Sequence, residues 1–259
     1  LHYPLRRQRQ MCIRDRFSDA REIGVDQKGN IYVGDFETGI VQAFDANGSY
    51  INQWFTGQRD DGNDMYLRDM AVTLDGRVFI PSWDGIYEFV GLSGQRLGKL
   101  TYPDEGYFED VAAAPDGSLV AVLFYAGENI VRFDNTGEVD LIIESPIGNV
   151  TDHSELDTQI ALDGLGNIYL LGSFNNLALI YNREGRYQNK FGGDGEGPGT
   201  FRAVGAIAVD NHSRIYISDF SGIQIFGLNG RYLESFDNQS GIREMCFDLN
   251  GDLYIVDVN

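Results

Sequence analysis

The chain repeats one short pattern six times, and this repetition restricts its fold more than any other feature. The six copies are VDQKGNIYV (25–33), VTLDGRVFI (72–80), AAPDGSLVA (113–121), LDGLGNIYL (162–170), VDNHSRIYI (209–217) and FDLNGDLYI (247–255). Their turn residues are Gly29, Gly76, Gly117, Gly166, Ser213 and Gly251, at spacings of 47, 41, 49, 47 and 38 residues. Such a period predicts stacked repeated units, as in propellers and solenoids.

Each copy predicts two inner strands joined by a tight turn. Just before each block, a large apolar residue is followed by a small one: Ile23-Gly24, Met70-Ala71, Val111-Ala112, Ile160-Ala161, Ile207-Ala208 and Met245-Cys246. The small residue indicates an innermost strand whose backbone approaches its neighbours closely. Three residues after each turn residue stands an aromatic residue or valine, namely Tyr32, Phe79, Val120, Tyr169, Tyr216 and Tyr254. We expect Tyr216 to be buried between neighbouring sheets.

Two further strands complete five of the six copies. A third strand ends at Phe44, Phe89, Phe133, Tyr181 and Phe226, and each is followed by a glycine turn and a fourth strand. The sequence thus predicts an all-β fold, a β-propeller with six blades of four-stranded antiparallel sheets and an incomplete sixth blade. Residues 17–259 would form this single domain, with blades at about 21–67, 68–108, 109–157, 158–204, 205–242 and 243–259 (partial).

Composition supports this class and excludes several partners. The 32 Gly, 14 Tyr and 16 Phe suit short strands joined by tight turns. A formal net charge of −19 disfavours nucleic acid and anionic membranes, because both are bound through Lys and Arg. No apolar run reaches the roughly 20 residues of a transmembrane helix. A protein, peptide or glycan ligand bound by a monomer is the expected kind of partner.

Both ends of the chain differ from the repeats. Residues 1–16 contain five Arg and one Asp and have no strand alternation, and MCIRDR within them resembles translated adapter sequence. We expect this leader to be non-native or disordered. Asn259 ends the chain inside a repeat, so we expect a fragment of environmental origin with an unpaired strand edge around Leu253 to Val256. Cys12 and Cys246 do not form the framework of a disulfide-rich domain.

One segment carries a family resemblance. The run FGGDGEGPGTFRAVGAIAVDNHSRIYISDFSGIQIFGLNGRYLESF (191–236) resembles an NHL repeat, in which a glycine-rich segment leads into IAVD, IYVxD and IQxF strands. The resemblance extends over about residues 21–257 and is weakest in the third blade. It implies a six-bladed, extracytoplasmic bacterial propeller that is periplasmic, secreted or lipid-anchored. Such propellers mostly bind ligands or act as scaffolds, and a minority, including lactonase relatives, are enzymes.

The loops between blades are the expected binding surface. They are long and mostly acidic, as in TGQRDDGNDMYLRD (56–69), TYPDEGYFED (101–110), ESPIGNVTDHSELD (144–157) and GGDGEGPGTF (192–201). Long loops on a rigid scaffold commonly carry binding residues, although they also occur simply as solvated connections. The ligand-binding residues predicted on this face are Arg68, Asp104, Glu105, His153, Arg202 and Arg243.

A ring of acidic residues is predicted where the six inner strands begin. The residue before each apolar position is Glu22, Asp69, Asp110, Gln159, Ala206 and Glu244. Converging oxygens suit a hard cation such as Ca²⁺, and the resemblance to lactonase propellers implies a metal at this place. The alternative is that Arg21, Arg68 and Arg243, one position earlier in three repeats, neutralise the ring as ion pairs.

Catalytic groups are scarce. Of the three histidines, only His153 falls on the loop side, and Asp152, His153 and Ser154 are adjacent and so cannot act as a triad. Asp35, Asp219 and Asp257 are expected to cap the loops that follow them. We therefore expect no catalytic residues and a non-enzymatic binding or scaffold propeller. The alternative is a cation-dependent hydrolase of the lactonase type.

Overall fold

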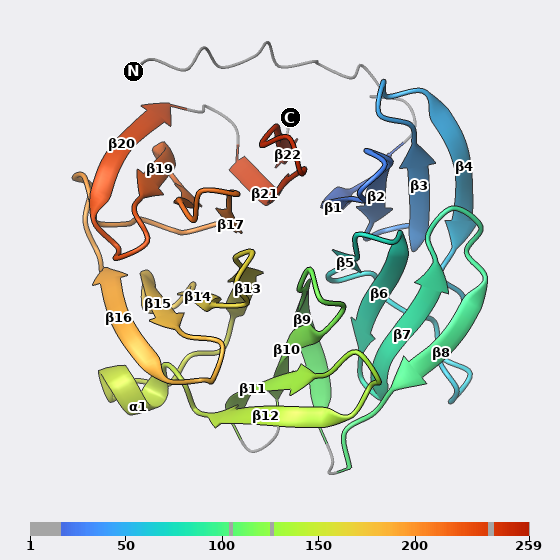
Figure 1. Ribbon diagram of the computed structural model, residues 1–259, viewed down its shortest axis with the longest axis horizontal. Helices are drawn as coiled ribbons and strands as arrows, with labels where there is room; N and C mark the ends of the chain where they lie inside the picture. The colour runs from blue at the N-terminus through green and yellow to red at the C-terminus, as the bar shows by residue number, and fades with distance from the viewer. Residues whose placement is uncertain (1–16, 104–105, 125–126, 238–240, 259) are drawn as a thin grey trace.

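The protein is a ring of β-sheets around a common axis (Figure 1). The computed structural model describes residues 17–103, 106–124, 127–237 and 241–258. Leader residues 1–16 and the predicted ligand residues Asp104 and Glu105 lie outside this set. Within it, the single helix is α1 (Gly148–Thr151). No helix among these residues has the length and apolar character needed to cross a membrane.

Five sheets have four strands each, and neighbouring strands are antiparallel. Blade 1 contains β1 (Ala20–Val25), β2 (Ile31–Asp35), β3 (Ile40–Phe44) and β4 (Tyr50–Phe55). Blade 2 contains β5 (Ala71–Val72), β6 (Arg77–Ser82), β7 (Gly85–Val90) and β8 (Arg96–Leu100). Blade 3 contains β9 (Tyr107–Ala113), β10 (Leu119–Phe124), β11 (Glu128–Phe133) and β12 (Val139–Glu144).

The second half of the ring repeats this plan. Blade 4 contains β13 (Thr158–Leu162), β14 (Ile168–Gly172), β15 (Leu177–Tyr181) and β16 (Tyr187–Gly192). Blade 5 contains β17 (Ile207–Val209), β18 (Ile215–Asp219), β19 (Gly222–Phe226) and β20 (Tyr232–Asp237). A two-stranded sheet of β21 (Gly241–Phe247) and β22 (Leu253–Val258) follows as blade 6. The predicted all-β propeller of four-stranded antiparallel sheets is confirmed.

Blade 6 closes the ring against blade 1. Strand β1 contacts both β21 and β22, and Tyr254 packs against the blade 1 core around Ile31, Val33 and Phe44. Among the described residues, no strand pairs with the outer edge of β22. Two strands therefore suffice to bury the inner faces of blades 1 and 5 in this structure.

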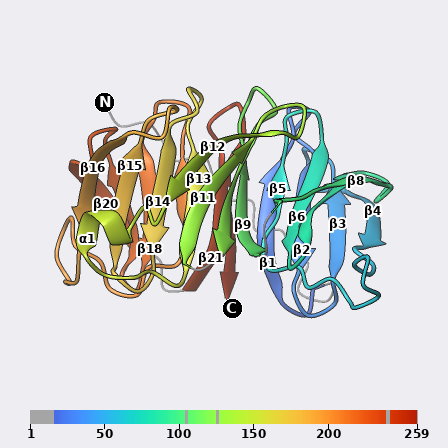
Figure 2. The same cartoon turned by 90° about the horizontal axis from the view of Figure 1, so that it is seen from below.

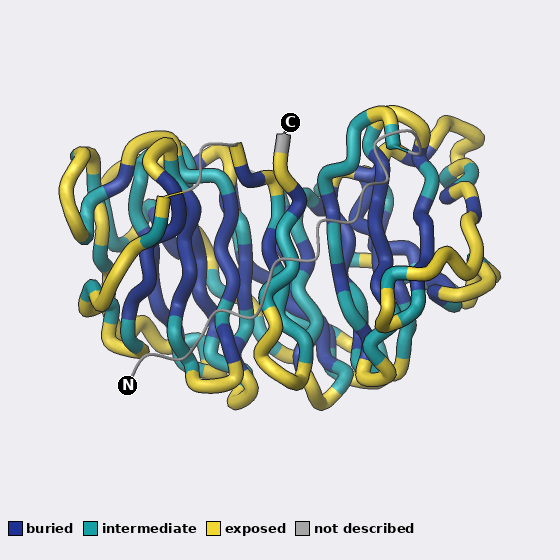
Figure 3. Tube along the Cα trace, turned by 90° about the horizontal axis from the view of Figure 1, so that it is seen from above, coloured by how far each residue is buried: buried dark blue, intermediate teal, exposed yellow. Residues whose placement is uncertain are grey.

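The strands cross the ring from one face to the other (Figure 2), and burial follows them (Figure 3). Exposed residues gather in the connections on both faces, whereas the second and third strands of the complete blades are largely buried. The face formed by the segments between blades and by the turns after each second strand is called the loop face below. The turns after the first strands form the opposite face.

A repeated aspartate stabilises the turn between the first and second strands, which is the motif that recurs in the sequence. Asp26 Oδ1 accepts hydrogen bonds from the backbone N–H groups of Lys28 and Asn30, and its Oδ2 accepts one from the Tyr32 hydroxyl at 3.1 Å. Asp163, Asp210 and Asp248 accept equivalent bonds in their own blades. One carboxylate thus fixes the turn and anchors the buried aromatic ring of the next strand.

Gly24 provides a test of the close approach predicted for the innermost strands. A Cβ atom added to Gly24 in β1 would lie 2.7 Å from the Cβ of Val72 in β5 of the next blade. We expect Gly24→Ala to lower the free energy of unfolding by about 1–3 kcal/mol, as overpacking does. Urea denaturation would measure it, and Val72→Ala in the same background should restore part of the loss. A Gly24→Ala protein as stable as the parent would refute the close contact.

Candidate functional site

The ring of polar residues at the start of the inner strands ties adjacent blades together. Asp69 of blade 2 accepts a hydrogen bond from the backbone N–H of Val111 in blade 3 at 2.5 Å. Asp110 of blade 3 accepts one from the N–H of Ile160 in blade 4 at 3.1 Å. Gln159 of blade 4 donates its amide to the carbonyl of Gly205 before blade 5 at 2.6 Å. These side chains therefore point between blades and satisfy backbone groups there.

The ring carboxyls hold protons more tightly than ordinary acids. Burial, the nearby Asp69 and Glu244, and a hydrogen bond to Asp69 raise the pKa of Glu22 well above its usual value. Burial raises the pKa of Asp69 to about 6, although its hydrogen bond with Glu22 opposes the shift. Burial and the charge of Asp69 raise the pKa of Glu244 to about 8 and that of Asp110 well above normal. The ring is therefore partly protonated near neutral pH.

The predicted neutralising arginines do not pair with this ring. Arg21 forms its ion pair with Asp19 at 2.6 Å, and its guanidinium lies 3.8 Å from the centre of the Phe36 ring. Arg68 and Arg243 are exposed. No ring carboxylate forms an ion pair with any arginine in the described part of the chain. The ion-pair expectation was wrong, because inter-blade backbone bonds and bound protons take the place of positive charge.

A calcium ion does not fit the ring as the structure arranges it. No three Asp, Glu, His or Cys side chains among the described residues are grouped closely enough to hold a metal ion. Asp69 and Asp110 each accept a hydrogen bond, through one carboxylate oxygen, from a backbone N–H group of the next blade. Glu244 accepts a hydrogen bond from the N–H of Met245. Gln159 Oε1 is buried without a hydrogen-bond partner, but it does not belong to any close group of metal-ligating side chains among the described residues. Asp69, Asp110 and Gln159 thus bridge neighbouring blades and Glu22 hydrogen-bonds Asp69 of the next blade, whereas Glu244 bonds within its own strand.

The other predicted loop-face residues are scattered. His153 is exposed after α1, and its backbone N–H bonds to Thr151. Arg202 pairs with Glu196 at 2.8 Å and lies over the Phe220 ring at 4.6 Å. Asp35 and Asp219 cap the turns after β2 and β18 by accepting backbone N–H bonds, as predicted. These residues do not form one site.

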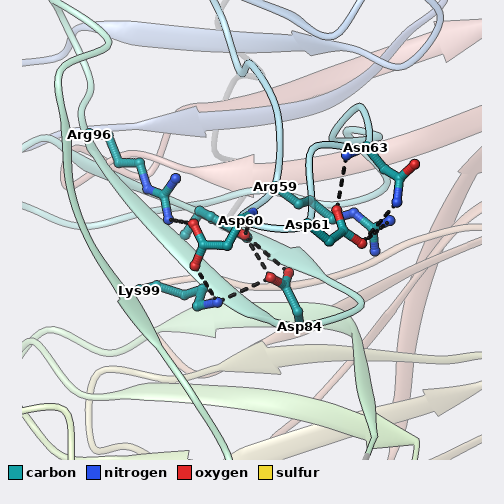
Figure 4. Close-up of polar contacts among 8 residues, drawn as sticks. Arg59, Asp60, Asp61, Asn63, Asp84, Arg96 and Lys99 are labelled. Carbon is teal, nitrogen blue, oxygen red and sulfur yellow. Dashed lines mark hydrogen bonds and ion pairs between the residues drawn. The ribbon is translucent and has the colours of Figure 1, made fainter.

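The first inter-blade loop is fastened to the outer strands of blade 2 (Figure 4). Asp60 forms ion pairs with Arg96 and Lys99 of β8, both at 2.7 Å. Lys99 also contacts Asp84, from the turn after β6, at 3.0 Å. The hydrogen bond from Lys99 is the main reason why the pKa of Asp60 lies below its usual value. Much of the charge of this loop is therefore satisfied within the protein, and the loop is held in place.

Beside this anchored loop, a small pocket of about 10 Å³, close to the minimum that holds one water molecule, lies between blades 2 and 3. It is lined by Tyr66, Arg68, Pro81, Ser82, Trp83, Tyr107, Phe108 and Glu109. The ring centres of Trp83 and Tyr107 are 4.4 Å apart, and Tyr107 stacks on Phe124 at 5.5 Å. Burial and the charge of Asp157 raise the pKa of Glu109 above normal, while Tyr107 and Arg68 oppose this shift. Arg68 is the predicted binding residue that belongs to this pocket.

A further repeated position in the sequence marks this surface and was not among the predicted site residues. An aromatic residue stands seven or eight positions after the turn residue in five repeats, at Phe36, Trp83, Phe124, Phe174 and Phe220. These positions follow or end the second strands, so all lie on the loop face. Trp83, Phe174 and Phe220 are more than half exposed. Repeated aromatic residues at a turn, where burial is not required, mark a potential binding surface.

The comparisons with known proteins agree with the fold. A family model described as "6-bladed beta-propeller" matches residues 154–257. The fold resembles virginiamycin B lyase from Staphylococcus aureus, with 13% identity, a TM-score of 0.67, and coverage of 92% of this chain and 78% of that chain. No curated protein matches the sequence.

Two further structures have related names. A gluconolactonase from Xanthomonas campestris has 13% identity, a TM-score of 0.63, and coverage of 93% of this chain and 84% of that chain. A calcium-binding protein, regucalcin from Agrobacterium tumefaciens, has 14% identity, a TM-score of 0.63, and coverage of 92% and 82%. Identities this low establish a shared propeller fold alone, so membership of the NHL subfamily stays a prediction.

Proposed function

We propose that this protein is a non-enzymatic binding propeller whose ligand site is the pocket between blades 2 and 3 on the loop face. The observation that carries the proposal is the exposed ring of Trp83, which packs on the half-buried Tyr107, beside the exposed Arg68 and the Glu109 carboxyl that is hydrogen-bonded to Tyr107. Convergent aromatic and polar groups in a concave site favour ligand binding. An extracytoplasmic location stays a prediction of the family resemblance.

Rigidity supports the same proposal. Trp83 lies on the turn between β6 and β7, Tyr107 begins β9, and the loop carrying Tyr66 and Arg68 is tied to β8 through Asp60. Side chains that are held in place before binding lose less conformational entropy when a ligand arrives. The pocket is therefore built on strands and an anchored loop, as a recognition site requires.

The alternative is a cation-dependent lactonase, and it is favoured by the names of the gluconolactonase and regucalcin neighbours. The structure disfavours it, because Asp69 and Asp110 each direct one carboxylate oxygen to a backbone N–H of the next blade, and the described acidic residues form no close metal-binding group.

Binding and turnover assays separate the two functions. We expect isothermal titration against cell-wall peptides, glycans and candidate protein partners to identify a ligand. Tyr66→Ala, which removes a 60% exposed ring from the pocket wall, should weaken its binding about threefold to tenfold. We expect no hydrolysis of gluconolactone with or without Ca²⁺. Measurable calcium-dependent turnover that Asp69→Asn abolishes would refute the proposal and support the lactonase alternative.

A further inference from the structure

We infer that the pocket between blades 2 and 3 binds a neutral saccharide; this inference rests on the proposed binding function and adds the chemical class of the ligand. It depends on two features of the same pocket: exposed flat rings, and polar groups of opposite charge side by side. Phe108 on the pocket wall belongs to the core between blades 2 and 3, whereas the exposed Trp83 and Tyr66 belong to no core cluster of the described residues.

The aromatic part of the pocket presents ring faces that the protein leaves uncovered. Trp83 is 51% exposed and Tyr66 is 60% exposed, although both belong to residue types that normally bury most of their surface. The planes of Trp83 and Tyr107 are inclined by 34°, and those of Tyr107 and Phe124 by 22°, so three rings form a continuous row across two blades. Trp83 and Tyr66 offer an apolar surface to the C–H face of a sugar ring at a low cost in conformational entropy, and Tyr107, packed between Trp83 and Phe124, supports Trp83.

The polar part of the pocket contains both a donor and an acceptor. Arg68 supplies guanidinium N–H donors and forms no ion pair within the described residues. Glu109 supplies a carboxyl group, and Ser82 also lines the pocket. A sugar hydroxyl both donates and accepts hydrogen bonds, so adjacent hydroxyls can satisfy Arg68 and Glu109 together.

Charge complementarity selects a neutral ligand over the charged ones. A cationic peptide is attracted by the overall charge of −19 but must approach the unpaired Arg68. An anionic ligand would pair with Arg68 but would be repelled by Glu109 and Asp157; burial first, and then the charge of Asp157, already raise the pKa of Glu109. A neutral polyhydroxylated ligand carries no charge, so neither Arg68 nor Glu109 would repel it.

The two tryptophans make the test direct. Trp54 is 8% exposed and packs on Phe89 in the core, whereas Trp83 faces the pocket. The Trp54→Phe protein therefore reports on Trp83 alone by intrinsic fluorescence. The probes are the neutral hexasaccharides of cellulose, xylan, mannan, starch and chitin, with hexalysine and hexagalacturonate as charged counterparts. We expect a saturable change with at least one neutral hexasaccharide and little change in its affinity with added NaCl.

Variants locate the response. Titration calorimetry with the responding hexasaccharide should show binding weakened about tenfold or more by Trp83→Ala and by Tyr107→Ala. Trp83→Phe should restore part of the affinity because it keeps a ring. The matched control is Phe174→Ala, since Phe174 is 65% exposed on the same face but does not line the pocket. It should bind as the parent does.

The outcomes distinguish this inference from the function on which it rests. A saturable, Trp83-dependent response to hexalysine or hexagalacturonate, with none to the neutral probes, would overturn the saccharide inference and leave the binding function intact. Saccharide binding that survives Trp83→Ala, or silence toward every neutral probe, would overturn the inference as well. Calcium-dependent lactone turnover would instead remove the proposed function itself.

Discussion

Tyr216→Ala should lower the free energy of unfolding by about 3–5 kcal/mol, the usual cost of truncating a large buried aromatic side chain. Tyr216 is 7% exposed, so the predicted burial is confirmed, and its ring centre lies 4.8 Å from that of Phe247 in blade 6. It belongs to the core between blades 5 and 6, with Ala206, Ile242 and Met245. The truncation would open a cavity at the seam where the incomplete blade joins the ring.

Tyr216→Phe is the matched control for this experiment. It keeps the ring and removes only the hydroxyl, whose hydrogen bond to Asp210 is long at 3.4 Å. Asp210 Oδ2 retains the side chain of Arg214 at 2.7 Å, so no buried carboxylate is left unpaired. We expect a loss of about 1 kcal/mol or less for the phenylalanine variant by urea denaturation. An alanine variant that loses less than about 1 kcal/mol would contradict the assignment of this seam as core.

The second large effect is a fall in stability as the pH rises from 5 to 8. The folded pKa is about 6 for Asp69 and about 8 for Glu244, and both exceed the ordinary values of 3.8 and 4.5. The folded chain therefore keeps protons that the unfolded chain releases, and this stabilisation is lost as the pH passes through the folded pKa values. One such proton over three pH units corresponds to about 4 kcal/mol of unfolding free energy.

Other titrating groups either add to this fall in the unfolding free energy or do not change it between pH 5 and pH 8. Burial raises the pKa of Glu128 to about 7, which adds to the fall. Asp35 and Asp60 have lowered pKa values, so they are ionised above pH 5 in the folded and unfolded states alike. Their contribution to stability would be lost only at more acidic pH.

Urea denaturation at pH 5, 6, 7 and 8 would measure this slope, and neutral variants would assign it. Glu244→Gln and Glu22→Gln cannot ionise, so each should flatten the dependence on pH. Asp45→Asn is the control, because Asp45 lies in an exposed turn and its pKa is lowered rather than raised. An unfolding free energy that is constant or that rises between pH 5 and pH 8 would show that the ring does not retain protons.

Repetition in the sequence determined the fold. A turn residue, a small residue before it and an aromatic residue after it recur in each copy, and each position has a local physical role that needs no knowledge of distant residues. Gly24 permits close approach, Asp26 fixes the turn, and Tyr32 fills the space between blades. Since every blade meets its neighbour in the same way, this local information was enough to predict five four-stranded sheets and a two-stranded sixth.

The tertiary structure decided what the ring and the loops do. The sequence placed Asp69, Asp110 and Glu244 around one axis, but whether their oxygens met a metal, an arginine or a backbone amide depended on angles between blades that sequence spacing does not encode. The pocket likewise joins Tyr66 and Arg68 from one loop with Trp83 from a turn and Tyr107 from the next blade. Side chains so far apart in the chain come together only when the ring closes, because the packing of one blade on the next sets their distance.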